Sequence, residues 1–318
     1  MIPVPERMYT RHDLFDGWEP EIVGSWADTL DGATYLEATL HGLRAPDSAE
    51  VATGRSLHDT AMTRFLHDRL WAQGCRPTAL MGGHAAERGS PTYRAAADIA
   101  AGLSRRGLTV LTGGGPGAME AGHLGARLAL STVDIGEAID DISADVDART
   151  FPLGVNELVV GGGFEPEALA QLHRWQIPAF RLADQTAAVA NDTVGIPTWH
   201  YGHEPPTPLA THHAKYFENS IREDGLLALA VNGIVFLPGS AGTLQEIFQD
   251  AAQNHYRSVR RTFSPMVFLD LDGHWSRTFP IRPVLEALFR EEDRAMVCWT
   301  ADLDEAVEFV DRFVIPDA

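Results

Sequence analysis

The feature that most constrains this chain is a glycine-rich turn between an apolar strand and a helix. Residues 108–111 are expected to form the strand and residues 119–130 the helix. The turn between them reads Thr112-Gly113-Gly114-Gly115-Pro116-Gly117-Ala118-Met119-Glu120. Glycines at such a place let backbone N–H groups face a ligand, and the helix N-terminus adds positive partial charge. The turn therefore predicts a site for a phosphate or another anion, and the alternative is a tight turn without a ligand.

The same order of strand, turn and helix recurs along most of the chain. Further apolar strands are expected over residues 78–81, 194–199, 233–237, 266–269 and 296–299. Further helices are expected over residues 92–106, 211–230, 243–256, 283–291 and 303–313. Strands that alternate with helices of this length form parallel sheets. The sequence therefore predicts an α/β, Rossmann-like fold, with a parallel sheet that carries helices on both faces.

The first part of the chain does not follow this order. Its aromatic residues are scattered without a regular period, and the helix expected at residues 57–73 begins after Ser56, which can cap it. Residues 1–74 are therefore expected to form an N-terminal helical extension. The rest of the chain, residues 75–318, is expected to form a Rossmann-like nucleotide-binding domain.

One segment inside that domain, at about residues 131–192, interrupts the alternation. It holds an acidic helical stretch at 137–147, a strand-like stretch at 157–160 and a helix at 165–176. Its glycine run at 161–163 precedes carboxylates that would repel a phosphate, so this run is expected to be structural. The segment is expected to be an insertion into the sheet domain, or a lobe beside it.

Charge limits the partners of the chain. Its 318 residues include 25 Lys and Arg against 44 Asp and Glu, which gives a formal net charge of −19. Non-specific binding of nucleic acid needs clustered cations that neutralise phosphates, and an anionic membrane surface makes the same demand. We therefore expect a small-molecule ligand, with no nucleic acid and no membrane as partners.

The chain also lacks targeting signals of the common kinds. Its first residues contain no apolar stretch of the signal-peptide type, and no apolar run is long enough to cross a membrane. Cys75 and Cys298 have no metal-like spacing and are expected to be reduced thiols. These features predict a soluble, cytoplasmic protein.

A second glycine turn repeats the pattern of the first. It reads Leu237-Pro238-Gly239-Ser240-Ala241-Gly242-Thr243-Leu244-Gln245-Glu246 and lies between an expected strand and an expected helix, which Thr243 can cap. Parallel strands end at the same edge of a sheet, so both turns are expected at one ligand-binding edge. One turn can hold a phosphate while Glu246 lies beside the sugar. Alternatively, Glu246 only complements the helix dipole.

Weaker candidates surround these two turns. Gly83 and His84 end the first expected strand and, with Arg88, either line the same edge or form a plain loop. Glu120 either contacts a nucleotide or only favours the helix dipole. Four histidines, at 200, 203, 212 and 213, include one pair with metal-like spacing, but no further ligands are evident. We therefore expect no metal, and a solvated or base-facing loop at these histidines.

The two motifs together resemble those of the LOG family, which is named for its cytokinin-activating members and often mislabelled "lysine decarboxylase". The family has a GGG-x-x-G-x-M turn, here Gly113 to Met119, and a later P-G-G-x-G-T-x-x-E, here Pro238 to Glu246. The resemblance covers about residues 78–130 and 194–312. It implies a Rossmann-like fold, no cofactor, and a homodimer or a higher homo-oligomer.

The resemblance also implies an activity, that of a phosphoribohydrolase. Such an enzyme hydrolyses the N-glycosidic bond of a nucleoside 5′-monophosphate, here an AMP-like nucleotide, to a free base and ribose 5-phosphate. The residues expected to hold the nucleotide are Gly113, Gly114, Gly115, Gly117, Met119, Glu120, Gly239, Ser240, Gly242, Thr243, Gly83 and His84. The chain departs from the family at Ser240, which replaces the second glycine of P-G-G, and no Arg-Lys pair precedes the second motif.

Glu246 and Arg222 are the expected catalytic residues. Cleavage of a C1′–N bond develops positive charge on the ribose, which the carboxylate of Glu246 can stabilise while it positions or deprotonates water. Arg222 is the nearest equivalent of the family's arginine and is expected to pair with the phosphate or to orient Glu246. Alternatively, Arg222 is a surface residue that pairs with Glu218 one helical turn away.

Of three other classes of function, one remains open and two are disfavoured. A non-catalytic nucleotide- or cofactor-binding carrier would use the same turns but would not need a carboxylate at the sugar. An NAD-dependent oxidoreductase is disfavoured, because the glycine fingerprint follows the second strand and not the first. A decarboxylase that uses pyridoxal phosphate would need a Schiff-base lysine, and nothing around the single lysine, Lys215, indicates that cofactor.

Overall fold

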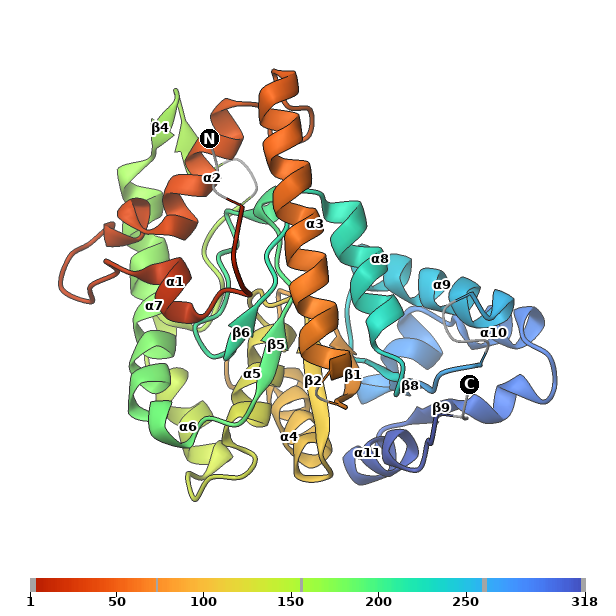
Figure 1. Cartoon of the computed structure of the whole chain (residues 1–318). Helices are drawn as coiled ribbons and strands as arrows, with labels where there is room; N and C mark the ends of the chain where they lie inside the picture. The colour runs from red at the N-terminus through yellow and green to blue at the C-terminus, as the bar shows by residue number, and fades with distance from the viewer. Residues whose placement is uncertain (1–3, 73, 155–156, 259–261, 316–318) are drawn as a thin grey trace.

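A computed structural model describes residues 4–72, 74–154, 157–258 and 262–315, and its centre is a seven-stranded sheet (Figure 1). The strands lie in the order β6-β5-β2-β1-β7-β8-β9, and every neighbouring pair is parallel. Their bounds are β1 (Arg76–Met81), β2 (Leu108–Thr112), β5 (Thr193–Gly195), β6 (His212–His213), β7 (Ile234–Phe236), β8 (Met266–Leu269) and β9 (Val297–Thr300). The predicted α/β fold with a parallel sheet is confirmed.

The chain changes direction across the sheet at β1. From β1 it runs through β2 and β5 to β6 at one edge, and then returns to β7 on the other side of β1. Ala79 pairs with Leu111 of β2 and with Ile234 of β7, so these three strands end at nearly the same level. Open α/β sheets bind ligands at the carboxyl ends of the strands where the order reverses. The turns after β1, β2 and β7 therefore lie where a ligand is expected.

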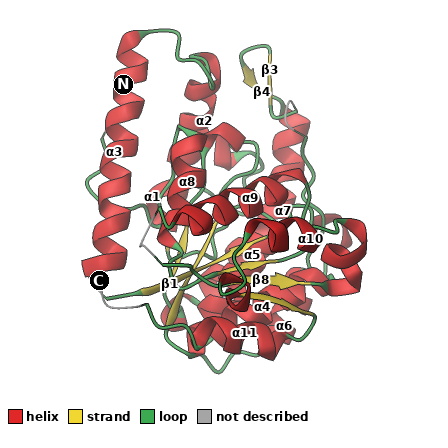
Figure 2. Cartoon of the chain, turned by 90° about the vertical axis from the view of Figure 1, so that its right-hand side faces the viewer, coloured by secondary structure: helices red, strands yellow, loops and turns green. Residues whose placement is uncertain are grey.

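Helices cover both faces of the sheet, as Figures 1 and 2 show. One face is covered by α4 (Pro91–Arg105), α5 (Ala118–Leu128), α6 (Ile135–Ile142) and α11 (Leu303–Asp311). The other face is covered by α3 (Ala49–Ala72), α8 (Asn219–Leu229), α9 (Ala241–Tyr256) and α10 (Arg282–Leu288). An apolar core lies on each face of the sheet. Side chains alternate along each strand, so Leu80 and Val235 enter the core beneath α4 and α5, while Met81 and Phe236 enter the core beneath α3 and α8.

The N-terminal segment and the insertion pack against each other around a third apolar core. The first contributes α1 (Arg11–Phe15) and α2 (Leu30–Leu40), which Figure 1 shows beside α7 (Pro166–Gln185) of the insertion. The ring of Trp18 stacks on Phe180 of α7 with centroids 3.8 Å apart, and its indole N–H donates to Gln176 at 3.0 Å. Each segment therefore covers apolar surface of the other.

The single lysine ties the N-terminal segment to the sheet. Lys215 follows β6, is fully buried, and forms an ion pair with Asp31 of α2. The same carboxylate accepts the indole N–H groups of Trp26 at 3.2 Å and Trp199 at 3.1 Å. A buried charge requires such partners, so the ion pair of Lys215 and Asp31 is satisfied within the fold.

The start of α3 differs from the prediction. The helix begins at Ala49, and Ser56, which was expected to cap it, lies inside the helix and donates to the carbonyl of Ala52 at 2.9 Å. Serine can satisfy its hydroxyl on the preceding turn in this way. The residue at the true start is Ser48, whose hydroxyl accepts from the N–H of Val51 at 3.3 Å.

The helix expected at residues 211–230 is also wrong in its first part. Only α8, from Asn219 to Leu229, is helical, and His212 and His213 form the edge strand β6. His212 pairs with Val194 of β5, and His213 forms an antiparallel bridge with Tyr9. The expected strand 194–199 ends earlier, at Gly195, whereas α7 extends beyond the expected residue 176 to Gln185. The extended conformation of β6 depends on pairing with residues distant in sequence, so local periodicity does not predict it.

The glycine run at 161–163 lies in the hairpin of β3 (Val159–Val160) and β4 (Gly163–Phe164), which agrees with the structural role expected for it. Cys75 and Cys298 are free thiols. Within the described ranges, none of the helices has the length and apolar character needed to cross a membrane.

Candidate functional site

The turns after β1, β2 and β7 contact one another directly. The N–H of Gly83 donates to the carbonyl of Pro238 at 3.2 Å, and the carbonyl of Gly83 accepts from Ala118 at 3.2 Å. Gly117, with φ 69°, lies against the carbonyls of Gly83 and His84, where no Cβ would fit. The structure therefore brings the two predicted glycine turns and the Gly83 turn together at one edge of the sheet.

Arg222 reaches this edge from α8 and is a buried residue, only 8% exposed. Its Nε donates to the carbonyl of Ile196 at 2.8 Å, and its Nη2 lies 2.5 Å from where a Cβ on Gly113 would stand. Within the described chain neither terminal nitrogen donates a hydrogen bond, and Nη1 lies 3.7 Å from Glu223. The alternative of a surface arginine that pairs with Glu218 is therefore wrong.

Glu246 lies half-buried on α9, near the same guanidinium. Burial raises the pKa of its carboxyl to about 7, the positive charge of Arg222 opposes this rise, and the negative charge of Glu223 adds to it. A carboxyl group with a pKa near neutrality can take up and release a proton under ordinary conditions. The two residues expected to be catalytic are thus brought together.

The first glycine turn is covered by side chains. Residues 113–117 are all buried. Besides Arg222, the thioether of Met119 lies over them, with Sδ 2.7 Å from a Cβ on Gly113 and Cε 2.9 Å from one on Gly115. A phosphate that contacts the amides of this turn would have to displace Met119 or share the space with it. The expected direct role of these amides stays a prediction.

The second glycine turn is open to solvent. Ser240 and Gly242 are exposed, and a Cβ on Gly242 would meet no atom within 4 Å. Thr243 does not cap the helix as predicted: α9 begins at Ala241, and the N-cap is Ser240, whose side chain makes no capping hydrogen bond. Thr243 instead packs against Gly239, where a Cβ would clash. The first N–H groups of α9 are therefore not capped by a side chain.

Glu120 and Arg88 belong to the core beneath the first turn. Glu120 is fully buried, and Arg88 donates to both of its oxygens, at 2.7 and 2.8 Å. Tyr93 donates a third hydrogen bond at 2.9 Å, and Arg88 also donates to the carbonyl of Trp175 at 2.8 Å. A buried carboxylate needs this many donors, so Glu120 and Arg88 face each other and do not line the edge.

The histidine loop is largely buried, with His203 and His213 buried and His200 and His212 half-buried. The loop is therefore not solvated as one alternative expected, and its other alternative, a base-facing loop, stays a prediction. His203 is 3% exposed and His213 is fully buried, and within the described residues neither ring nitrogen of His213 has a hydrogen-bond partner. Burial lowers the pKa of His203 to about 4 and that of His213 well below its ordinary value. His84, by contrast, is exposed at the edge. Among the residues that the structure describes, no group of three or more candidate ligands could hold a metal.

Glu204, in the same loop, lies beside the first glycine turn and is a candidate site residue that the sequence did not reveal. Its Oε2 lies 3.8 Å from where a Cβ on Gly115 would stand. Burial raises the pKa of its carboxyl, and the charges of His84 and Arg222 oppose this rise. The residue stands in a proline-rich loop without periodicity, so no sequence pattern distinguishes it from a solvated loop residue.

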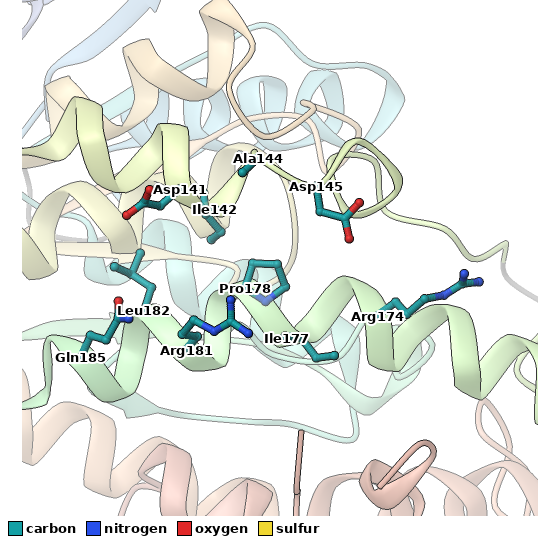
Figure 3. Close-up of a pocket in the computed structure, with 10 residues that line it drawn as sticks. All are labelled: Asp141, Ile142, Ala144, Asp145, Arg174, Ile177, Pro178, Arg181, Leu182 and Gln185. Atoms are coloured by element: carbon teal, nitrogen blue, oxygen red, sulfur yellow. The ribbon is translucent and has the colours of Figure 1, made fainter. Parts of the chain in front are cut away.

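A separate cavity of about 480 Å³ lies between α6 and α7, within the insertion (Figure 3). Asp141 and Asp145 lie on one side of it, and Arg174 and Arg181 of α7 lie on the other. No residue of the glycine turns lines this cavity. It is therefore distinct from the site at the strand ends.

The fold and site define an α/β protein that presents polar groups at the carboxyl ends of its central strands. No protein-family model matches the chain, and no curated protein matches its sequence. It is similar to the molybdenum cofactor carrier protein of Chlamydomonas reinhardtii in two structures, at 16% and 15% identity, with 75% of this chain and 96% and 97% of that protein covered, each with a TM-score of 0.41.

The chain is also similar to a molybdenum cofactor binding protein from the phototrophic bacterium Rippkaea orientalis. The identity is 13%, the match covers 74% of this chain and 95% of that one, and the TM-score is 0.39. TM-scores of this size assign neither a ligand nor an activity to this chain. Its function must be inferred from its own residues.

Proposed function

We propose that this protein binds a phosphate-bearing small molecule of the nucleoside 5′-monophosphate class and acts as a nucleotide- or cofactor-binding carrier. The observation that carries the proposal is Arg222, a buried guanidinium whose terminal nitrogens make no hydrogen bond within the described chain. A largely buried hydrogen-bond donor without an acceptor is unfavourable. A phosphate would accept from both terminal nitrogens in the bidentate geometry that guanidinium groups favour.

The N-terminus of α9 supplies the second contact for the phosphate. This helix has 16 residues, and its exposed first turn has no side-chain cap. Free N–H groups and the helix dipole at such an end favour an anion. Arg222 and this helix end lie at the same strand edge, so one phosphate can contact both.

Binding by Arg222 and α9 can be tested by calorimetric titration with ribose 5-phosphate, AMP and adenosine. AMP and ribose 5-phosphate should bind, and adenosine should bind much more weakly. Arg222→Gln should weaken AMP binding by about 10- to 100-fold, since hydrogen bonds to charged groups contribute about 1.5–3 kcal/mol. Arg282→Gln, at an exposed arginine of α10, should bind AMP like the wild type. Equal binding of AMP and adenosine, or no effect of Arg222→Gln, would rule the site out.

A second candidate, phosphoribohydrolase, is favoured by one observation, the pKa of Glu246 near 7 beside Arg222. An ionised Glu246 would accept a proton from water as the water oxygen bonds to C1′. The C1′–N bond would break with its electron pair on the base, which takes up a proton. At neutral pH this pKa leaves about half of the Glu246 carboxyls protonated. Hydrolysis requires the ionised form of Glu246, whereas binding does not.

Product analysis separates the two candidates. The protein is incubated with nucleoside 5′-monophosphates, including N6-modified AMP, and assayed for free base and ribose 5-phosphate. Release by the wild type and loss of release in Glu246→Gln would establish the hydrolase. Binding of the nucleotides without release would leave the carrier function.

A further inference from the structure

Glu204 stands in a loop that backbone hydrogen bonds hold over the first glycine turn. The N–H of Glu204 donates to the carbonyl of Tyr201 at 2.8 Å, and the N–H of Thr207 donates to the carbonyl of Gly114 at 2.8 Å. The first bond fixes the start of the loop, and the second fastens the loop to the turn. The side chain of Glu204 is only 18% exposed. The loop therefore directs a largely buried carboxyl group to the ligand edge.

This carboxyl group has no hydrogen-bond donor within the described residues. The nearest basic atom is Nε2 of His203, 3.7 Å from Oε1, which is beyond hydrogen-bond distance. His203 is neutral at pH 7, because burial lowers its pKa to about 4. A largely buried acceptor without a protein donor needs one from solvent or from a ligand.

Glu204 and Arg222 mark two ends of one binding region. Arg222 lies against Gly113, and Glu204 lies against Gly115, two residues further along the same turn. A carboxylate repels a phosphate, so Glu204 must face another part of a ligand whose phosphate is at Arg222. In a nucleotide, that part is the sugar or the base.

The acceptor pattern of a carboxylate favours the base. An ionised carboxyl offers two coplanar acceptor oxygens and no donor. It is satisfied best by two adjacent N–H groups in one plane. The 2-amino-6-oxopurine ring of guanine presents such a pair at N1 and the 2-amino group. Hypoxanthine lacks the amino group, and adenine has an acceptor at N1.

We propose that Glu204 is the specificity-determining residue of the site and that it accepts hydrogen bonds from N1–H and the 2-amino group of a guanine-type base. The preferred ligand is therefore a guanine nucleotide. This inference rests on the proposed function, because it requires the phosphate of the same ligand at Arg222. The glycine turns alone do not distinguish one base from another, whereas Glu204 would select guanine.

The test compares GMP, IMP and AMP with ribose 5-phosphate by calorimetric titration. GMP and IMP differ only in the 2-amino group, so their comparison in the wild type needs no variant. GMP should bind about 10- to 150-fold more tightly than IMP, the range expected for the loss of one hydrogen bond to a charged group. Glu204→Gln should bring GMP and IMP to within about twofold of each other and leave ribose 5-phosphate binding unchanged.

Glu292→Gln serves as the control, because Glu292 is exposed and outside the site. Equal binding of GMP and IMP by the wild type would overturn the role of Glu204, as would a GMP preference that survives Glu204→Gln. If ribose 5-phosphate binds while all bases bind equally, only the base assignment fails. If ribose 5-phosphate and every nucleotide fail to bind, the proposed function fails with it.

Discussion

Gly113 shows how the lack of one side chain shapes the site. Its backbone stands where Nη2 of Arg222 and Sδ of Met119 both approach, at 2.5 and 2.7 Å from the position of a Cβ. Glycine is therefore needed here for close approach, and its φ does not lie in the left-handed region. The glycine allows a guanidinium to lie directly against the turn after β2.

Replacing Gly113 by alanine should disturb that contact. We expect Gly113→Ala to lose about 1–3 kcal/mol of unfolding free energy, because overpacking forces side chains out of place, and to weaken ribose 5-phosphate binding. Gly225→Ala is the matched control, because a Cβ at Gly225 of α8 meets no atom within 4 Å. It should gain about 0.5–1 kcal/mol from helix propensity. Urea unfolding measures both, and equal effects of the two variants would contradict the close approach.

Glu246 should make stability depend on pH. Its pKa rises from the ordinary 4.5 to about 7 in the folded state. The folded state therefore binds this proton more tightly, and the resulting stability is fully present below pH 4.5 and lost as pH rises through 7. Glu246→Gln should remove this loss, so the variant should gain up to about 3 kcal/mol on the wild type between these pH values. Parallel urea titrations of the two proteins over this pH range provide the measurement.

At the scale of elements, Arg88 joins parts of the fold that are distant in sequence. From the loop after β1 it binds Glu120 of α5, the carbonyl of Ala148 and the carbonyl of Trp175 in α7. Its guanidinium also lies 4.4 Å from the centre of the Trp175 ring. The helix that begins at the first glycine turn is therefore held to the insertion by one buried cation.

Removing this cation should be strongly destabilising. Arg88→Met would leave the buried carboxylate of Glu120 with Tyr93 as its remaining side-chain donor, and we expect a loss of about 3–5 kcal/mol. The double variant Arg88→Met, Glu120→Gln should recover part of this loss, because it removes the unpaired charge. Arg282→Met, which breaks an exposed ion pair, should lose less than about 1 kcal/mol. A loss of similar size in Arg88→Met and Arg282→Met would be inconsistent with a charge-dependent role of Arg88.

At the scale of the whole molecule, the N-terminal segment, the insertion and the sheet are packed as one unit. The third core contains side chains from all three parts, among them Trp26, Trp175 and Trp199. The buried pair of Lys215 and Asp31 lies among them, with the lysine 5.0 Å from the centre of the Trp199 ring. The parts that depart from the simple strand and helix order thus support each other and the sheet edge.

Lys215→Met should therefore weaken the whole molecule. It would leave the charge of Asp31 buried with only two indole donors, and we expect a loss of about 3–5 kcal/mol. Because Trp26 and Trp199 donate to Asp31, tryptophan fluorescence follows the change during urea unfolding. Arg7→Met is the control at an exposed ion pair and should lose less than about 1 kcal/mol. Unfolding midpoints that agree between Lys215→Met and the wild type would contradict this role.

Much of the fold was accessible from the sequence because its signals are local. The strand at residues 266–269 agrees with β8. The helix expected at 92–106 differs from α4 by one residue at each end, and the helix expected at 243–256 differs from α9 by two residues at its start. Apolar periodicity and glycine turns act within a few residues, so they can be recognised without knowledge of the fold. The helix prediction was wrong over residues 211–218, because the conformation there follows from pairing with β5 and from the bridge to Tyr9.

For the site, the sequence by itself determined the two glycine turns, their place after parallel strands and the candidates Arg222 and Glu246. Only the tertiary structure decided that Arg222 is buried, with terminal nitrogens that donate no hydrogen bond within the described residues, that Glu120 faces Arg88, and that Glu204 reaches the turn. The physical reason is that burial and the choice of partners depend on chain segments that meet only when the sheet forms. Glycine conformation and side-chain periodicity, by contrast, are properties of short stretches of chain.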